Sequence, residues 1–180
     1  MEDLSLHILD IAENSIDAGA DRIEINIKDS VVSNTVILTI TDNGGGMDAA
    51  TLEKVTDPFF STKTVRKKRF GLGIPLLSQA CEESGGGMSI DSAPGKGTMI
   101  TAGFRRSHID RKPLGDMGAT MMTLIGGHPE INFVLTVEHD KDSYRLDTEE
   151  LRQELDGAPL NLPEVLRLVK DDVNEAFKEA

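Results

Sequence analysis

Two runs of β-branched residues, separated by a short polar stretch, constrain the fold of this chain more than any other feature. RIEINIK (22–28) and TVILTIT (35–41) are each alternating or continuously apolar, as strands of a packed sheet are. Before them, apolar residues recur at helical spacing from Leu4 to Ala18, and Gly19 supplies a stop signal. The chain therefore opens with a helix and two neighbouring strands.

The next part of the chain continues this mixture. We expect a short helix near Asp48 and a second helix that starts near Ile74, because Pro75 is tolerated only in a first helical turn. Two strands joined by a Pro/Gly turn follow in residues 85–104. This order predicts an α+β fold, a two-layer α/β sandwich whose mixed, mostly antiparallel sheet carries helices on one face.

The composition changes beyond His108, and we expect one domain over 1–106 and a small C-terminal α/β extension over 107–180. A helix near 115–125, the β run INFVLTVEH (131–139), a turn at DKD and two acidic helices are predicted there, the last opening at 161–163. The extension could add strands to the sheet edge, cover the ligand site or form a dimer contact. The sequence leaves these three roles open.

Charge and composition exclude several classes of function. The net charge of −12 should repel nucleic acid and anionic lipid, so neither is expected as a partner. No apolar run approaches the roughly 20 residues that span a bilayer, and the N-terminus is acidic where a signal peptide would be basic. The single cysteine, Cys81, excludes an internal disulfide, and a cytoplasmic protein is expected.

One segment departs from the acidic trend. KTVRKKR (63–69) places five basic residues in seven positions. A run of this kind is usually a solvated loop. Beside glycine-rich turns in an acidic chain, it is also a candidate anion site.

Polar residues gather on one face of the first helix. Asp10, Glu13, Asn14 and Asp17 fall within an arc of roughly 100°, opposite the apolar stripe. The face could simply be solvated. However, no lysine or arginine of this helix offsets its like charges, and an Asn oxygen with carboxylates suits Mg²⁺.

Three glycine-rich stretches accompany these residues. DNGGGM (42–47) forms either an ordinary loop or a close approach of backbone to a ligand, and Asp42 could accept a hydrogen bond from an exocyclic amine. FGLG (70–73) opens a helix, whose free N–H groups suit phosphate. APGKGT (93–98) is most simply a β-turn entering a strand. Walker A and GxGxxG patterns are absent from the sequence.

The order and spacing of these motifs resemble a known family. ENSIDAGA, DNGGGM, DPFFSTK, GLGIPLL and GKGT resemble, one for one, the five nucleotide-binding motifs of the GHKL superfamily of ATPases, which has the histidine kinase-like ATPase fold. The resemblance covers about residues 4–104 and implies ATP and Mg²⁺ as ligands.

The resemblance also implies roles for the matching positions. Asn14 would be the magnesium ligand, and Asp10 stands where the family has its general base, usually Glu. Asp42 would bind the adenine amino group, with Thr98 beside it. Lys63 and the basic run would form the lid over ATP. Kinases of the family usually have a further glycine where this chain has Arg69, so Arg69 could touch phosphate. The full set of implied nucleotide-binding residues is Asn14, Asp17, Asp42, Gly44, Gly46, Met47, Lys63, Arg69, Gly71, Leu72, Gly73 and Thr98.

Two classes of function remain for such a domain. One is an enzyme of the signal-transduction type, a protein kinase or ATPase that acts on a separate partner protein, because the dimerisation helices of a histidine kinase do not precede the first motif. The other is a catalytically weak, ATP-gated module that regulates its partner by binding. A homodimer is compatible with either. His7 is expected to be a packing or pocket-rim residue rather than a phosphoacceptor.

Overall fold

The computed structural model describes residues 3–55 and 73–178, and it confirms the α+β fold. The helices are α1 (Leu4–Asp17), α2 (Ala49–Leu52), α3 (Gly73–Glu83), α4 (Met117–Gly127), α5 (Thr148–Glu154) and α6 (Pro163–Lys178). The strands are β1 (Arg22–Ser30), β2 (Thr35–Asp42), β3 (Gly87–Ser92), β4 (Thr98–Arg105), β5 (Asn132–His139) and β6 (Asp142–Asp147).

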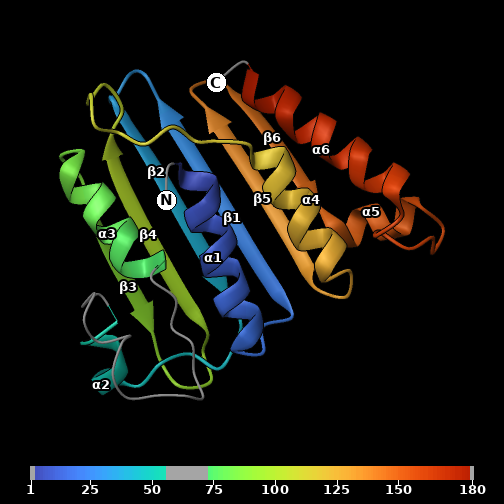
Figure 1. Ribbon diagram of the computed structural model, residues 1–180, viewed down its shortest axis with the longest axis horizontal. Helices are drawn as coiled ribbons and strands as arrows, with labels where there is room; N and C mark the ends of the chain where they lie inside the picture. Colours follow the sequence, from blue (N-terminus) through green and yellow to red (C-terminus); the bar gives the residue numbers. More distant parts are fainter. Residues whose placement is uncertain (1–2, 56–72, 179–180) are drawn as a thin grey trace.

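The described strands form one six-stranded sheet with the order β3-β4-β2-β1-β5-β6. Only the β1–β5 pair in it is parallel, so the sheet is mixed and mostly antiparallel, as predicted. Figure 1 shows α1, α3 and α4 side by side on one face of the sheet, with α5 and α6 near its β6 edge. None of the helices in the described ranges combines the length and the apolar character that a bilayer span requires.

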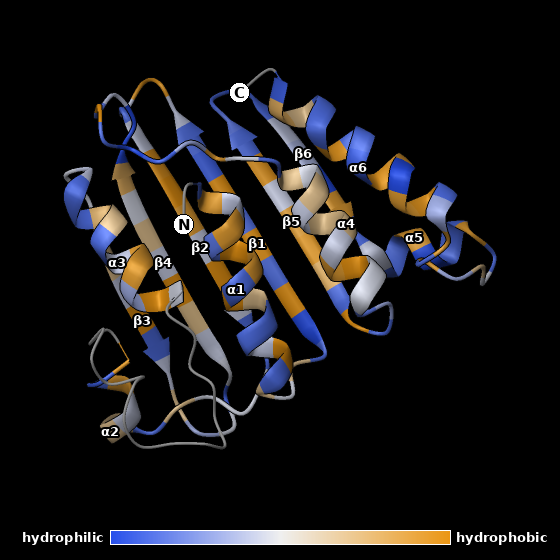
Figure 2. Cartoon of the chain, in the orientation of Figure 1, coloured by the Kyte–Doolittle hydropathy of each residue, from blue (hydrophilic) through white to orange (hydrophobic). Residues whose placement is uncertain are grey.

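Alternation along the strands decides which face is covered. In β1 the side chains of Ile23, Ile25 and Ile27 are buried, whereas the intervening polar residues are not. Figure 2 shows the same apolar stripes on the strands beneath the helices. The predicted helix signals also hold, since Asp48 caps α2 and Pro75 lies in the first turn of α3.

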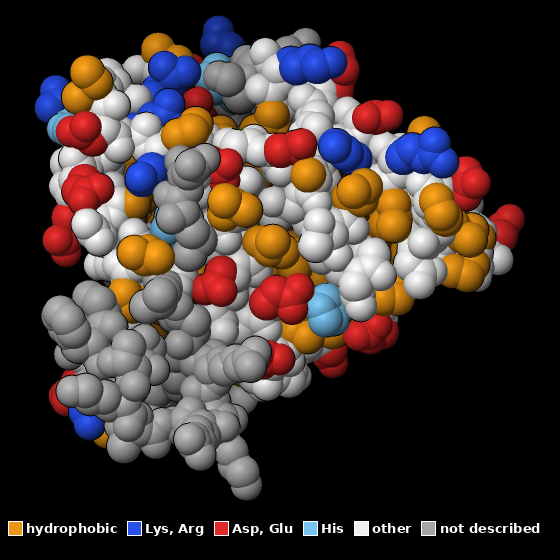
Figure 3. All heavy atoms as spheres, viewed as in Figure 1, with side chains coloured by type: hydrophobic (Ala, Val, Ile, Leu, Met, Phe, Trp, Pro, Cys, Tyr) orange, Lys and Arg blue, Asp and Glu red, His pale blue; other side chains and the backbone are white. Residues whose placement is uncertain are grey.

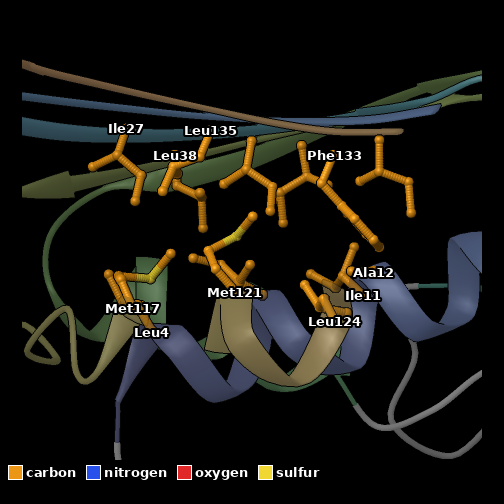
Figure 4. Packing of buried hydrophobic residues seen from close by; sticks show 14 of the residues in the cluster. Leu4, Ile11, Ala12, Ile27, Leu38, Met117, Met121, Leu124, Phe133 and Leu135 are labelled. Atoms are coloured by element: carbon orange, nitrogen blue, oxygen red, sulfur yellow. The ribbon is translucent and has the colours of Figure 1, made fainter. Parts of the chain in front are cut away.

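The core draws on both halves of the chain. Ile27, Leu38, Phe133 and Leu135 project from the sheet towards α1 and α4, and Met121 of α4 meets them (Figure 4). Residues beyond 106 therefore extend the sheet past β1 and share its hydrophobic core, which is the first of the three roles considered for the C-terminal extension. A domain boundary at residue 106 stays a prediction.

One strand was not predicted. β6 pairs with β5 in a hairpin in which His139 is opposite Asp142, so the expected DKD turn is the hairpin loop. Asp140 adopts a positive φ of 45° there. β6 lies at the sheet edge and has only two large apolar residues, Tyr144 and Leu146. Its alternating pattern is therefore weak, which is why the strand was not predicted.

Candidate functional site

Asp42 ends β2 with a carboxylate held by three donors. Its Oδ2 accepts a hydrogen bond from the Ser15 hydroxyl at 2.7 Å. Its Oδ1 accepts the backbone N–H groups of Gly44 at 2.9 Å and Thr98 at 3.2 Å. The residue is only 9% exposed. A carboxylate has about four lone-pair positions, so these three donors orient the group and still leave room for one more.

The glycine loop after Asp42 interlocks with the β3–β4 turn. Gly46 has a φ of 66°, and a Cβ at that position would overlap the carbonyl group of Ala93. Gly97 has a φ of 78°, and a Cβ there would overlap the backbone of Asp42. Both glycines are therefore required by the backbone itself, which brings two motifs separated in sequence against each other.

Two serines that the sequence analysis did not select complete this arrangement. Ser15 is buried and connects α1 to Asp42. The Ser92 hydroxyl accepts the Met47 N–H at 2.9 Å, donates to the Gly97 carbonyl and lies 3.0 Å from the Thr98 hydroxyl. The sequence offered one indication of their role, because Ser15 lies inside a motif and Ser92 directly precedes one. A serine alone is too common to be selected on that basis.

Asp10 and Asn14 lie one turn apart on α1, facing the start of α3. The Gly73 N–H donates to Asp10 Oδ2 at 2.9 Å, and the Asn14 amide donates to the same oxygen at 3.4 Å. Within the described ranges no donor reaches the Asn14 amide oxygen, which leaves that oxygen available to a hard cation. The structure thus brings together Asp10, Asn14 and Gly73 of the predicted set.

The other acidic residues of this helix lie apart from that group. The Glu13 carboxylate faces His128, whose Nε2 is 3.2 Å and 3.3 Å from its two oxygens. Asp17 is exposed at the last position of α1. The Glu13 carboxylate therefore has a hydrogen-bond partner in the C-terminal extension, and this contact was not predicted from the sequence.

His7 is a buried histidine on the same helix. It is only 1% exposed, and neither ring nitrogen has a hydrogen-bond partner in the described part of the chain. Burial lowers the pKa of His7, although the backbone of Gly73 acts in the opposite direction. A buried neutral imidazole is consistent with the packing role predicted for it.

The structure does not bring all the predicted residues into view. Lys63, Arg69, Gly71 and Leu72, together with the basic run, lie outside the described residues. The described residues also contain no group of three or more His, Cys, Asp or Glu side chains that could hold a metal ion. A magnesium ion in this site would need phosphate or water oxygens to complete its coordination.

The sequence is similar to one known protein family and to bacterial sensor proteins. Residues 2–108 match the family model described as histidine kinase-, DNA gyrase B- and HSP90-like ATPase. A protein from Shewanella frigidimarina described as a sensor protein is 38% identical over 104 residues, which are 57% of this chain and 16% of that protein. The sensor kinase CckA from Brucella abortus is 37% identical over 79 residues, or 44% of this chain and 8% of the kinase.

A solved structure supports the fold as well. The N-terminal domain of a DNA repair protein superposes with a TM-score of 0.53 at 17% identity, covering 82% of this chain and 53% of that one. This likeness concerns the fold alone. The matched stretches span less than a fifth of the two sensor relatives, so their whole-protein activities do not transfer directly.

Proposed function

The chain belongs to the family of histidine kinase-, DNA gyrase B- and HSP90-like ATPases, and from this premise we propose that it is a Mg-ATP-dependent kinase or ATPase acting on a separate partner protein. Its first 108 residues contain a histidine kinase-like ATP-binding domain. The sensor kinases among its relatives support a signalling role.

The observation that carries the proposal is the fixed acceptor at Asp42. Ser15 and two backbone N–H groups orient its carboxylate, which suits the exocyclic amine of adenine, a hydrogen-bond donor. Gly44 and Gly46 pack the loop after Asp42 against the backbone of Ala18 and Ala93, which supports Asp42 in its place. We propose that Gly44, Gly46, Thr98 and Met47 complete this side of the nucleotide site.

The phosphate side of the site would lie at the start of α3. Asn14 supplies an amide oxygen for magnesium, and its neighbour Ser15 bonds Asp42, so one helix links the adenine end to the metal end. Magnesium would neutralise phosphate charge there. Gly73 stands at the N-terminus of α3, where the helix dipole favours an anion. We propose that Lys63, Arg69, Gly71 and Leu72 complete the phosphate side, and that Asp17 acts only through its charge.

Asp10 is proposed as the general base. Its Oδ2 already accepts the Gly73 N–H and the Asn14 amide. The other oxygen, Oδ1, has no such partner in the described residues and is the atom that we assign to proton transfer.

The same contacts favour a second candidate function. Because Asp10 anchors the first residue of α3, it could serve to position that helix when nucleotide binds, without productive chemistry. The protein would then be an ATP-gated module that regulates its partner by exposing a surface.

Thermal unfolding tests the binding proposal. At a ligand concentration of about 100 Kd, Mg-ATP should stabilise the folded state by about 2.7 kcal/mol, a rise in Tm of roughly 5–10 °C for a chain of this size. Asn14→Ala should remove the magnesium dependence of that rise. Asn161→Ala, at an exposed position near the start of α6, is the matched control and should keep it. An unchanged Tm at millimolar Mg-ATP would refute the proposal.

Turnover separates the two candidate functions. Asp10→Asn keeps an acceptor for the Gly73 N–H but removes the base, so an enzyme should keep ATP affinity and lose turnover. Incubation with radiolabelled ATP and candidate partners distinguishes transfer, hydrolysis and simple binding. Equal turnover by the wild type and Asp10→Asn would favour the gated module.

A further inference from the structure

Two loops meet at the end of the sheet that lies away from the proposed ATP site. They are the β1–β2 turn (31–34) and the end of β4 with the segment that follows it (105–112). Thr35 pairs with Arg105 at this end of β2, whereas Asp42 pairs with Thr98 at the other end. Seven residue steps of about 3.3 Å each place the two ends about 23 Å apart. We call this region the basic end, and it comprises Val31, Val32, Arg105, Ile109, Arg111 and Lys112.

Hydrogen bonds fix the two loops to each other. The Arg106 N–H donates to the Asn34 carbonyl at 3.0 Å, and the Ser107 N–H donates to the Asn34 side chain at 3.0 Å. The Asn34 amide returns a bond to the Ser107 hydroxyl at 2.9 Å. The surface that these loops carry is therefore held in shape before any partner arrives.

Aliphatic side chains are exposed on both loops. Ile109 is 93% exposed, Val32 is 90% exposed and Val31 is 54% exposed. Single exposed aliphatics are common on protein surfaces, so one of them would mean little. Three β-branched side chains on two adjoining, hydrogen-bonded loops are a more specific arrangement, since their contact with water is costly and their geometry is fixed.

The cations of the basic end lack carboxylate partners. Arg105, Arg111 and Lys112 make no ion pair within the described ranges, although the chain carries a net charge of −12. Arg111 donates to the Arg106 and Lys112 carbonyls at 2.9 Å and 3.3 Å, so its guanidinium also holds the loop. The same region has two exposed carboxylates, Asp110 and Asp140, so the cations exceed them by one. The neighbouring Arg106 is different, because its Nε is 2.6 Å from the buried Asp29 carboxylate. On the face drawn in Figure 3, blue and orange side chains, with a few red ones among them, lie at the upper left.

We propose that the basic end binds an acidic segment of a partner protein that also carries aliphatic side chains. Cations and exposed aliphatics on one surface are complemented by carboxylates and aliphatics on the other. The whole chain is acidic, so an extended anionic surface such as a membrane or a nucleic acid would be repelled by the rest of the molecule. A short acidic segment can contact the cations of the basic end alone, because charges farther away than about one Debye length, roughly 8–10 Å, are largely screened.

Fluorescence anisotropy with a defined probe tests the proposal. The probe is a labelled dodecapeptide with six glutamates and two leucines, and its control has glutamine in place of every glutamate. The full chain, without nucleotide, should bind the acidic peptide with a Kd on the order of 10–100 µM at 50 mM NaCl, and about tenfold more weakly at 300 mM NaCl. The glutamine peptide should not bind measurably.

Charge reversal locates the surface. Arg105→Glu combined with Lys112→Glu should weaken binding at least tenfold, and Ile109→Ser should weaken it several-fold. Arg167→Glu, an exposed cation on α6, is the matched control and should have little effect. An unchanged Mg-ATP-induced rise in Tm in each variant would show that the fold and the nucleotide site are intact, so failure here and failure of the proposed function are distinguishable.

Three results would overturn the proposal. The first is equal binding of the acidic peptide by the wild type and the double charge-reversal variant. The second is binding to vesicles with 30% anionic phospholipid, lost in that variant, without binding to the peptide. The third is a concentration-dependent dimer that the same variant abolishes, which would assign the basic end to a second copy of this chain.

Discussion

Replacing His7 with leucine should stabilise the protein, and the gain should be larger in acid. His7 is buried on α1, and neither ring nitrogen has a hydrogen-bond partner in the described part of the chain. An unpartnered buried polar group costs about 1–3 kcal/mol, so an apolar side chain of similar volume should raise the free energy of unfolding by about 1 kcal/mol at pH 7.5.

The pH dependence of this gain follows from the direction of the pKa shift. Burial lowers the pKa of His7 in the folded state, so the unfolded chain binds a proton more readily. The wild type therefore loses stability as the pH falls through the ordinary histidine pKa of about 6.5, until the pH is below the lowered folded value. For one proton, this loss is at most about 1.4 kcal/mol between pH 7.5 and 5.5. His7→Leu removes it.

Urea unfolding followed by far-ultraviolet circular dichroism is the suitable assay, because the chain has no tryptophan and a single tyrosine. His7→Gln is the matched control: it removes the titrating group but keeps buried polar atoms, so it should flatten the pH dependence without the gain at pH 7.5. A difference between His7→Leu and the wild type that is the same at pH 5.5 and pH 7.5 would contradict the reasoning.

Two glycine substitutions test the backbone of the site. Gly46→Ala should lower the free energy of unfolding by more than the roughly 1–2 kcal/mol of a left-handed alanine, because its Cβ would overlap the Ala93 carbonyl. Gly95 has a similar φ of 71° in open space, so Gly95→Ala should lower the free energy of unfolding by only that amount. Urea unfolding measures both losses. Equal losses would show that the close approach is unimportant. Gly73→Ala should lower stability by up to about 1 kcal/mol, since displacing the Asp10 carboxylate removes a helix cap worth about 0.5–2 kcal/mol, more than the gain in helix propensity. A more stable Gly73→Ala protein in the same assay would show that the Asp10 contact contributes little.

The sequence was sufficient for most of the fold where local patterns and tertiary packing agree. Strong alternation in β1, the stop at Gly19 and the restricted position of Pro75 each have one physical solution, and the structure adopts it. β6 was not predicted, because its formation depends on pairing with β5, which its own residues do not reveal. Edge strands need fewer apolar side chains, so their pattern is weak.

The site was predictable as a set of motifs, but the contacts between them were not. Motif order gave Asp42, Asn14 and the glycines, whereas the hydrogen bond from Ser15 to Asp42 depends on how α1 lies over the end of β2. The Glu13–His128 contact joins residues 115 positions apart, and no local sequence pattern predicts it. Such contacts require the tertiary arrangement itself.

The C-terminal extension contacts helix α1, which carries residues of the proposed ATP site. The Leu4 and Ser5 N–H groups donate to the carbonyls of Pro113 and Leu114, both at 2.9 Å, which fixes the start of the helix. Further along, His128 holds Glu13, one residue before Asn14. Because α1 carries Asp10, Asn14 and the serine that orients Asp42, one helix contacts both the segment after β4 and the proposed ATP site. The basic end includes residues of that same segment, directly before Pro113. A partner bound there would thus act on the element that the nucleotide must also contact.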